Sequence, residues 1–229
     1  MRLLENDKDY AIVGAVPVDA PGITYIYGRQ SCDTRSMEPG DIDAGNSEYG
    51  GQETMVICDR VFIPNEMIFM NGEYEFASML VERFTCYHRR SYVCKTGLGD
   101  VLIGAAAAIA DYNGVPKVSH IKDKIIEMTH LNESIYAAGI ASSYQGHKMK
   151  SGVFLSDDML ANVCKHNVTR LPYELARLAQ DVAGGILVTL PSEAEFRSEI
   201  TGPLLEKYLK GKSGIEVENR MRILRLIEN

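Results

Sequence analysis

The sequence has no excess of positive charge, no long apolar run and no N-terminal signal segment. Its 229 residues carry a formal net charge of -7, whereas a nucleic-acid surface needs a concentrated basic patch. The apolar run GAAAAIA, at 104–110, is far shorter than the ~20 residues that cross a bilayer. The N-terminus, MRLLENDKDY, is charged and lacks an apolar signal core. We therefore expect a cytoplasmic protein with no nucleic-acid partner and no membrane segment.

Cysteine is scarce and irregularly placed. Five cysteines are an odd number without regular spacing, which does not indicate a disulfide framework. In a reducing compartment they are free thiols, core residues or metal ligands, and the ordinary interpretation of each is a small buried hydrophobic residue. The sequence also lacks internal repeats, low-complexity segments and a serine in a nucleophile-elbow context. A Ser-His-Asp triad therefore has no support.

The composition is that of an ordinary globular protein, with 45% hydrophobic and 24% charged residues. The β-rich residues 10–28 predict two strands joined by a turn, with breaks at Pro17 and at Pro21-Gly22. The polar stretch 36–51 predicts a loop, and residues 52–63 predict one or two further strands that end at Pro64.

Helical spacing of apolar residues replaces this β pattern from Phe76 onward. The expected helices are 76–110 with a break near Gly97–Gly99, 119–143 with Ser119 as N-cap, 156–183 bent near Pro172, 202–210 and 216–228. A β segment followed by long helices predicts an α+β fold, with domains over 1–70 and 71–229.

Reactive side chains are concentrated in residues 82–100, which read ERFTCYHRRSYVCKTGLGD. The spacing Cys86-x-His88-x5-Cys94 offers up to three ligands that suit zinc or an iron–sulfur cluster. The alternative is a helix with two packed cysteines and an ordinary surface histidine.

Three other motifs have weaker support. Glu127-x-x-His130 is half of a di-iron carboxylate site, but no second copy occurs, so a structural role for His130 is the better interpretation. Gly97-x-Gly99 follows a helical stretch rather than a strand, which argues against a dinucleotide fingerprint. Gly184-Gly185 predicts a helix C-cap, and a backbone without side chains also allows close approach of a phosphate or adenine.

Six segments resemble the 4-hydroxybutyryl-CoA dehydratase/vinylacetyl-CoA Δ-isomerase group, which belongs to the 4-hydroxyphenylacetate 3-hydroxylase superfamily. These segments are YGRQSCDTR (27–35), GGQETMVICDRVFIPN (50–65), ERFTCYHRRSY (82–92), GLGDVLIGAAA (97–107), HIKDKIIEMTHLNE (120–133) and AGGILVTLPSEAEF (183–196). The resemblance implies part of a β-barrel-like middle domain in 1–70, followed by an acyl-CoA dehydrogenase-like C-terminal helical bundle in 71–229, truncated at its end. It covers about the central and later half of the family protein, so we expect the chain to be a fragment of the full enzyme.

The resemblance also implies a homotetramer that binds FAD and a 4Fe-4S cluster with three cysteine ligands and one histidine ligand. By match, His88 and Cys94 are cluster ligands, and the other two cysteines lie outside this chain. The catalytic residues are His88, Glu53 and Tyr92, and a further catalytic glutamate also lies outside the chain. Four residues match positions near the cofactors, with the last three close to the FAD of a neighbouring subunit: Lys95, Asp181, Gly184 and Gly185.

One departure from the family pattern concerns the cluster. In that pattern one more residue separates the histidine from the cysteine, usually with two glycines before the cysteine. Here five residues separate His88 from Cys94, and Val93 stands in place of the glycines. A shift by one helical residue rotates a ligand by ~100° about the helix axis, which makes Cys86 an alternative ligand.

The activity that the resemblance implies is radical dehydration of 4-hydroxybutyryl-CoA to crotonyl-CoA, with isomerisation of vinylacetyl-CoA. Loss of the acidic α proton and one electron to the flavin makes the β proton removable, and the cluster iron is a Lewis acid for the hydroxyl group. His88 would accept the α proton, with Glu53 positioning or relaying it. The alternatives are a flavin-dependent 4-hydroxyphenylacetate 3-monooxygenase-type oxygenase and an inactive truncated remnant.

Overall fold

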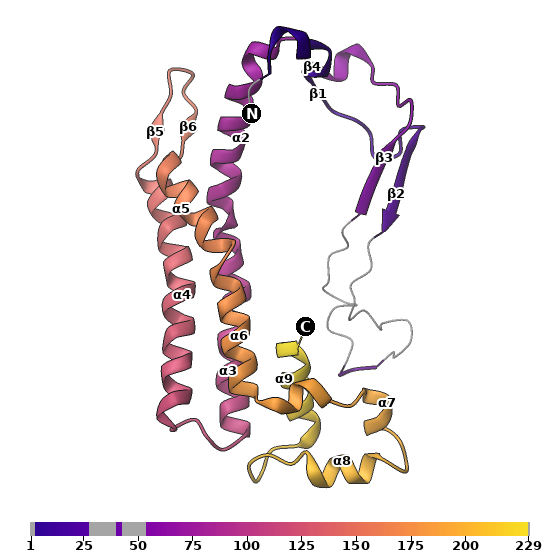
Figure 1. Cartoon of the computed structure of the whole chain (residues 1–229), viewed down its shortest axis with the longest axis vertical. Coiled ribbons are helices and arrows are strands. Elements are labelled where there is room, and N and C mark those ends of the chain that lie inside the picture. Colours follow the sequence, from indigo (N-terminus) through magenta and orange to yellow (C-terminus); the bar gives the residue numbers. More distant parts are fainter. Residues whose placement is uncertain (1–2, 28–39, 43–53, 229) are drawn as a thin grey trace. The chain divides into compact units, whose positions relative to one another are not determined.

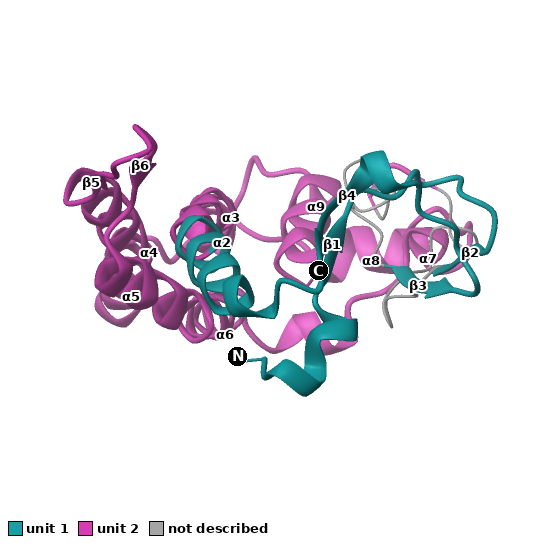
Figure 2. Cartoon of the chain, turned by 90° about the horizontal axis from the view of Figure 1, so that it is seen from above, with its two compact units in different colours: residues 1–31, 51–88 teal, residues 32–50, 89–229 magenta. Residues whose placement is uncertain are grey.

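The computed structural model describes residues 3–27, 40–42 and 54–228. The chain divides into two compact units, shown in different colours in Figure 2. Unit 1 comprises residues 1–31 and 51–88, and unit 2 comprises residues 32–50 and 89–229. Each unit is built from its own contacts and is described separately below.

Unit 1 contains short strands in two antiparallel pairs. Strand β1 pairs with β4, Ile12 opposite Asn71, and β2 pairs with β3, Ile23 opposite Cys58. The strands and short 3-10 helices of this unit are η1 (Glu5–Tyr10), β1 (Ile12–Gly14), β2 (Ile23–Tyr27), β3 (Thr54–Cys58), η2 (Asn65–Met67), β4 (Ile68–Asn71) and η3 (Tyr74–Phe76).

The predicted strands are confirmed, but they are shorter than the predicted runs. The two strands expected in 10–28 exist, but they pair with later segments and not with each other. Among the described residues 54–63, β3 is the one strand, and the backbone turns sharply after it at Arg60, whose φ is 52°. Among the described residues, all strands belong to two-stranded sheets and no barrel is formed.

A nearly continuous helical run follows the strands. It consists of α2 (Ala77–Ser91), the 3-10 turn η4 (Tyr92–Cys94) and α3 (Lys95–Tyr112). The predicted break at Gly97–Gly99 is wrong, since both glycines lie within α3 and the helix tightens earlier, at η4. By length and composition, Tyr74–Tyr112 could cross a membrane, with 33% of its most apolar window buried. Core helices of soluble proteins meet the same test, so this finding is weak evidence for a membrane span.

Unit 2 is helical. Helix α3 packs against α4, α6 and α9, and α4 also packs against α5 and α6 (Figure 1). The remaining elements are α4 (Ser119–Tyr144), β5 (His147–Lys148), β6 (Phe154–Leu155), α5 (Asp158–Val168), α6 (Leu171–Ala183), η5 (Gly185–Thr189), α7 (Glu193–Phe196), α8 (Gly202–Tyr208) and α9 (Val217–Glu228).

The core of unit 2 forms where small and large apolar residues interlock. Ala105, Ala106 and Ala110 of the 104–110 run are almost fully buried and allow neighbouring helices to approach α3 closely. The apolar residues that recur at helical spacing on α4 are buried or partly buried, with Met128 and Ile135 fully enclosed. Burial of each large side chain contributes about 1.5–3 kcal/mol before entropy losses.

The helix predictions for unit 2 are largely confirmed, with corrections at helix ends. Asp157 caps α5 by accepting a hydrogen bond from the Leu160 N–H, but the N-cap of α4 is Val118 rather than Ser119. The helix expected over 156–183 is two helices that break before Leu171. Pro172 lies in the first turn of α6, where its missing N–H leaves no bond unmade, so it begins a helix instead of bending one.

Candidate functional site

The reactive segment lies where α2 gives way to η4 and α3. His88 is in the last turn of α2, Tyr92 and Cys94 are in η4, and Lys95 is the first residue of α3. His88, Cys94 and Lys95 are exposed and Tyr92 is partly buried. The His88 ring stacks on the Phe84 ring of the preceding turn, with centroids 5.4 Å apart. One continuous helical run therefore carries these four predicted site residues within eight positions.

Helix α5 contacts the backbone and side chains of this segment. The Arg89 guanidinium donates a 2.6 Å hydrogen bond to Asn162 Oδ1, and the Lys165 ammonium lies 3.8 Å from the centroid of the Tyr92 ring. Between them, the buried Cys164 thiol lies 3.8 Å from the Arg90 carbonyl oxygen. Burial raises the pKa of the Cys164 thiol, with a smaller opposing effect from Arg90, so this thiol is a packing group.

Helix α4 is fastened to the first turns of α3 by Asn132. The buried Asn132 amide donates to the Thr96 carbonyl at 3.0 Å and to Asp100 Oδ1 at 2.8 Å. A Cβ atom at Gly99 would lie only 2.0 Å from Asn132 Oδ1. Beside this contact is a cavity of about 360 Å³, and Lys95 and Asn132 are among its lining residues. Both glycines that resemble a nucleotide fingerprint thus lie inside helix α3, and Gly99 is a helix-packing position.

The residues predicted to approach FAD lie at the C-terminal end of α6. Asp181 forms an ion pair with Lys124, at 3.0 Å. Gly184 ends the helix with a φ of 85°, as the C-cap prediction requires, and no atom lies within 4 Å of a Cβ added at Gly184 or Gly185. The backbone here is open to close approach by another group.

The residues present fit part of a cluster's ligand set. Imidazole nitrogen and thiolate sulfur are suitable ligands for iron, and His88 and Cys94 are both exposed. Cys86 is only 3% exposed, which makes it a poorer ligand than Cys94. In the part of the chain that the structure describes, no three His, Cys, Asp or Glu side chains form a metal-binding group. The remaining ligands would therefore come from elsewhere, and Glu53 lies outside the described residues.

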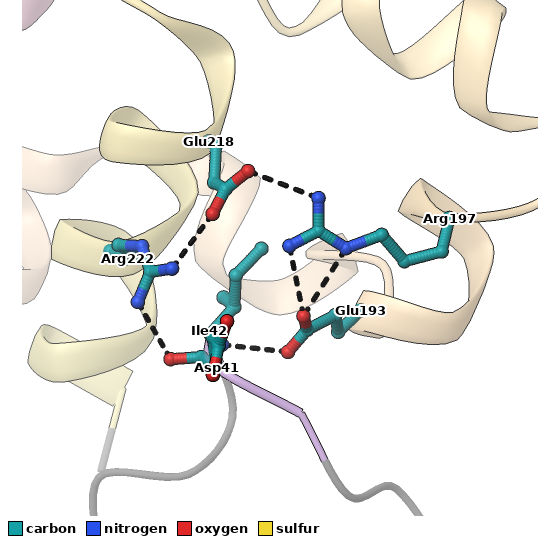
Figure 3. A network of polar contacts seen from close by, with 6 residues as sticks. All are labelled: Asp41, Ile42, Glu193, Arg197, Glu218 and Arg222. Carbon is teal, nitrogen blue, oxygen red and sulfur yellow. Dashed lines mark hydrogen bonds and ion pairs between the residues drawn. The ribbon is translucent and has the colours of Figure 1, made fainter.

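A second polar cluster was not predicted from the sequence (Figure 3). It holds both polar atoms of the peptide bond between Asp41 and Ile42. The Ile42 N–H donates to Glu193 Oε2 at 2.6 Å, and the Asp41 carbonyl accepts from Arg222 at 2.7 Å. We call this arrangement, which also includes Arg197 and Glu218, the peptide clamp.

Ion pairs close the peptide clamp into a ring. Arg197 bridges Glu193 and Glu218, at 3.1 and 3.0 Å, and Glu218 also binds Arg222, at 2.7 Å. Hydrogen bonds from Arg197, then Arg222, lower the pKa of Glu218. The signal available in the sequence was two Glu-x-x-x-Arg pairs, which on exposed helices are ordinary neighbours.

Two family models match the chain. The model for the C-terminal part of 4-hydroxyphenylacetate 3-hydroxylase matches residues 77–229, and the model for its N-terminal part matches residues 1–70. The chain therefore belongs to the 4-hydroxyphenylacetate 3-hydroxylase family.

Among its relatives, the 4-hydroxybutyryl-CoA dehydratase/vinylacetyl-CoA-Delta-isomerase of Clostridium aminobutyricum is 56% identical over 239 residues, covering 100% of this chain and 49% of the relative. A solved structure described as an oxygen-tolerant archaeal 4-hydroxybutyryl-CoA dehydratase from N. maritimus is 79% identical. Its TM-score is 0.96, and the match covers 100% of this chain and 46% of that chain. The chain thus spans about half the length of these relatives.

More distant structures establish the fold. The oxygenase component of 4-hydroxyphenylacetate 3-monooxygenase, complexed with FAD, is 24% identical with a TM-score of 0.85 over 98% of this chain and 47% of that chain. Butyryl-CoA dehydrogenase from Megasphaera elsdenii is 14% identical with a TM-score of 0.53, and the match covers 94% of this chain and 46% of that chain. The fold is therefore acyl-CoA dehydrogenase-like, as predicted.

Proposed function

We propose that this chain is part of a lyase and isomerase that dehydrates 4-hydroxybutyryl-CoA to crotonyl-CoA and isomerises vinylacetyl-CoA. The observation that carries the proposal is the 79% identity and TM-score of 0.96 to an archaeal 4-hydroxybutyryl-CoA dehydratase over the whole chain. Because the match covers the whole chain, it spans the segment that carries the exposed His88 and Cys94 and the partly buried Tyr92.

His88 and Cys94 would hold one side of a 4Fe-4S cluster, which supplies Lewis-acid chemistry when bound. An imidazole can bind a metal ion through a ring nitrogen or accept a proton at that nitrogen. His88 would accept the α proton of the thioester, and Tyr92 would orient the substrate through its phenol group. Glu53 would position or relay the same proton.

FAD is the proposed second cofactor, and it supplies one-electron chemistry when bound. A member of the fold has been solved with FAD. In this chain the open backbone at Gly184 and Gly185 would allow the cofactor of a neighbouring subunit to approach. Asp181 and Lys95 would supply polar contacts.

The proposed full enzyme is a cytoplasmic homotetramer in which residues 1–70 belong to a barrel-like middle domain and residues 71–229 to a helical bundle. A flavin-dependent phenol oxygenase is the competing function, because a 4-hydroxyphenylacetate 3-monooxygenase oxygenase component from Thermus thermophilus is 24% identical over 98% of this chain and 46% of that protein. Iron content and substrate separate the two functions.

The test is an anaerobic dehydration assay combined with iron, sulfide and FAD analysis of the protein and its His88→Ala variant. We expect crotonyl-CoA from the wild type, and a loss of at least ~100-fold in kcat with reduced iron in the variant. The matched control is His120→Ala, since His120 is an exposed histidine on the first turn of α4. An iron-free protein that hydroxylates phenols would contradict the proposal.

A further inference from the structure

We propose that Lys165 is a positioning residue that fixes the ring of Tyr92 for the dehydration reaction. The inference rests on the proposed function, in which Tyr92 faces the substrate. Lys165 lies on α5 and Tyr92 begins η4, so the two residues come together only through tertiary packing. Neither the family match nor the sequence pattern assigns a role to this lysine.

The contact itself is close and directional. The Lys165 ammonium lies 3.8 Å from the centroid of the Tyr92 ring, well within the ~6 Å over which a cation is attracted to an aromatic face. Both side chains are partly buried, and partial removal of water strengthens such a contact. Tyr92 also packs against the apolar cluster of Ile135, Ala138, Cys164 and Val168. The ammonium and the apolar cluster together restrict the rotation of the ring.

The backbone beneath Tyr92 needs this kind of support. A 3-10 turn such as η4 has poorer hydrogen-bond geometry than an α-helix, so contacts with neighbouring helices contribute to its stability. Helix α5 binds the preceding turn through Asn162 to Arg89, at 2.6 Å, and through the Cys164 thiol to the Arg90 carbonyl, at 3.8 Å. Together with the Lys165–Tyr92 contact, they form a series of three contacts along α5, in which the α5 residues and their partners follow the same sequence order.

Helix α4 also packs against η4, through Gly139 and Val93. A Cβ atom at Gly139 would lie 2.7 Å from the Val93 Cβ, so α4 passes η4 with no room for a side chain. Val93 thus packs directly against the α4 backbone at Gly139, and Lys165 lies over the Tyr92 ring. Helices α4 and α5 therefore both hold the turn that carries the proposed catalytic tyrosine. Lys165 on α5 supplies the positive charge that attracts the face of the Tyr92 ring.

A second lysine–tyrosine contact in the chain provides a comparison. The Lys207 ammonium lies 5.0 Å from the centroid of its sequence neighbour Tyr208. Tyr208 is 72% exposed, so its ring is not packed in place. This pair is a local surface contact with no connection to the candidate site, and Lys207 is a suitable control.

The kinetic test compares Lys165→Met, Lys165→Arg and Lys207→Met in the anaerobic dehydration assay. Methionine keeps the length and apolar stem of lysine, and arginine keeps the charge and the attraction to the ring. We expect Lys165→Met to lower kcat about tenfold with KM changed less than about twofold, and Lys165→Arg to return kcat to within about threefold of the wild type. FAD and iron content should be unchanged in all three variants, and Lys207→Met should behave as the wild type. A wild-type kcat in Lys165→Met, or an arginine variant as slow as the methionine variant, would overturn the positioning role.

A second measurement examines the contact without using activity. Reductive ¹³C-dimethylation keeps lysine charges, and NMR should show one dimethyl-lysine signal shifted upfield by the Tyr92 ring. That signal should be absent in Lys165→Met and should lose its shift in Tyr92→Leu. If the shift is present but the wild type does not form crotonyl-CoA, the proposed function is wrong and the positioning role falls with it, although the contact stands. If the wild type is active and no shifted signal exists, the function stands and the inference about Lys165 is overturned.

Discussion

The Ile42 N–H donates a 2.6 Å hydrogen bond to Glu193 Oε2, across 151 positions of sequence. The Ile42 side chain is 5% exposed and packs with Phe196, Val217 and Met221. A Cβ atom at Gly40 would lie 2.2 Å from the same carboxylate, so a larger residue there would displace the Glu193 side chain. The buried Glu193 carboxylate therefore acts together with Arg222 and the apolar packing of Ile42 to hold residues 40–42 on the helices of unit 2.

Replacing Glu193 by alanine should lower the free energy of unfolding by about 2–3 kcal/mol. The change leaves the Ile42 N–H buried without an acceptor and removes one partner of Arg197. Glu199→Ala is the matched control, because Glu199 is exposed in the same region, and its effect should stay within about 0.5 kcal/mol. Urea unfolding of the two variants checks the prediction, and equal midpoints would contradict it.

The ion pairs of Glu218 should stabilise the protein only above acidic pH. Its pKa lies below the usual 4.5, chiefly because Arg197 and then Arg222 donate hydrogen bonds to the carboxylate. The unfolded chain therefore takes up the proton first as pH falls, and the stabilisation is lost as pH falls through the folded pKa. Glu218→Gln should cost about 1 kcal/mol at pH 7 and progressively less below pH ~4.5. Unfolding of this variant and of Glu206→Gln, an exposed control, should diverge at pH 7 and converge in acid.

Two glycines of α3 should respond oppositely to alanine. At Gly99 the added Cβ would meet Asn132 Oδ1 at 2.0 Å, whereas at Gly97 no atom lies within 4 Å. Gly99→Ala should therefore destabilise the protein by about 2–3 kcal/mol, and Gly97→Ala should stabilise it by about 0.5–1 kcal/mol through helix propensity. Thermal melting compares them directly. A Gly99→Ala variant as stable as Gly97→Ala would show that α4 is not held closely at this point.

The reactivity of Cys94 should report cluster assembly. Cys58 and Cys94 are exposed, while Cys86 and Cys164 are buried. Iodoacetamide should therefore label Cys58 and Cys94 in the iron-free protein, because only accessible thiolates react readily. After anaerobic reconstitution with iron and sulfide, Cys94 should be protected and Cys58 should still react. Mass spectrometry of the labelled peptides measures both, and unchanged labelling of Cys94 would argue against its role as a ligand.

Periodicity predicted the long helices because their core-facing side chains repeat at helical spacing. Helix α4 was predicted within about one residue at its C-terminal end, since its buried stripe runs through Met128 and Ile135. Strand pairing was not predictable in the same way. Strand β1 joins β4 across more than fifty residues, and three-residue strands carry too little alternation to specify a partner.

The candidate site could be predicted where its residues are contiguous. His88, Tyr92, Cys94 and Lys95 are visible as a cluster in the sequence, and the structure places them on one helical run. Lys165 and the peptide clamp depend on packing between distant segments, and nothing at their own positions indicates those contacts. Both polar groups that the peptide clamp binds, the Ile42 N–H and the Asp41 carbonyl, belong to the backbone. Every residue other than proline carries these groups, so the sequence contains no signal that marks this position.

The peptide clamp also has a consequence for the order of events on the ribosome. Residues 41 and 42 leave the ribosome long before their partners, because Glu193 and Arg222 follow 151 and 181 residues later. At the usual ~5–20 residues per second of synthesis, the segment waits roughly 10–35 seconds for those partners. The β2–β3 pair can form early from local contacts, but residues 40–42 can reach their final contacts only after Arg222 has been synthesised. Slow translation or a chaperone acting in this interval would therefore affect residues 40–42 more than the strands on either side of them.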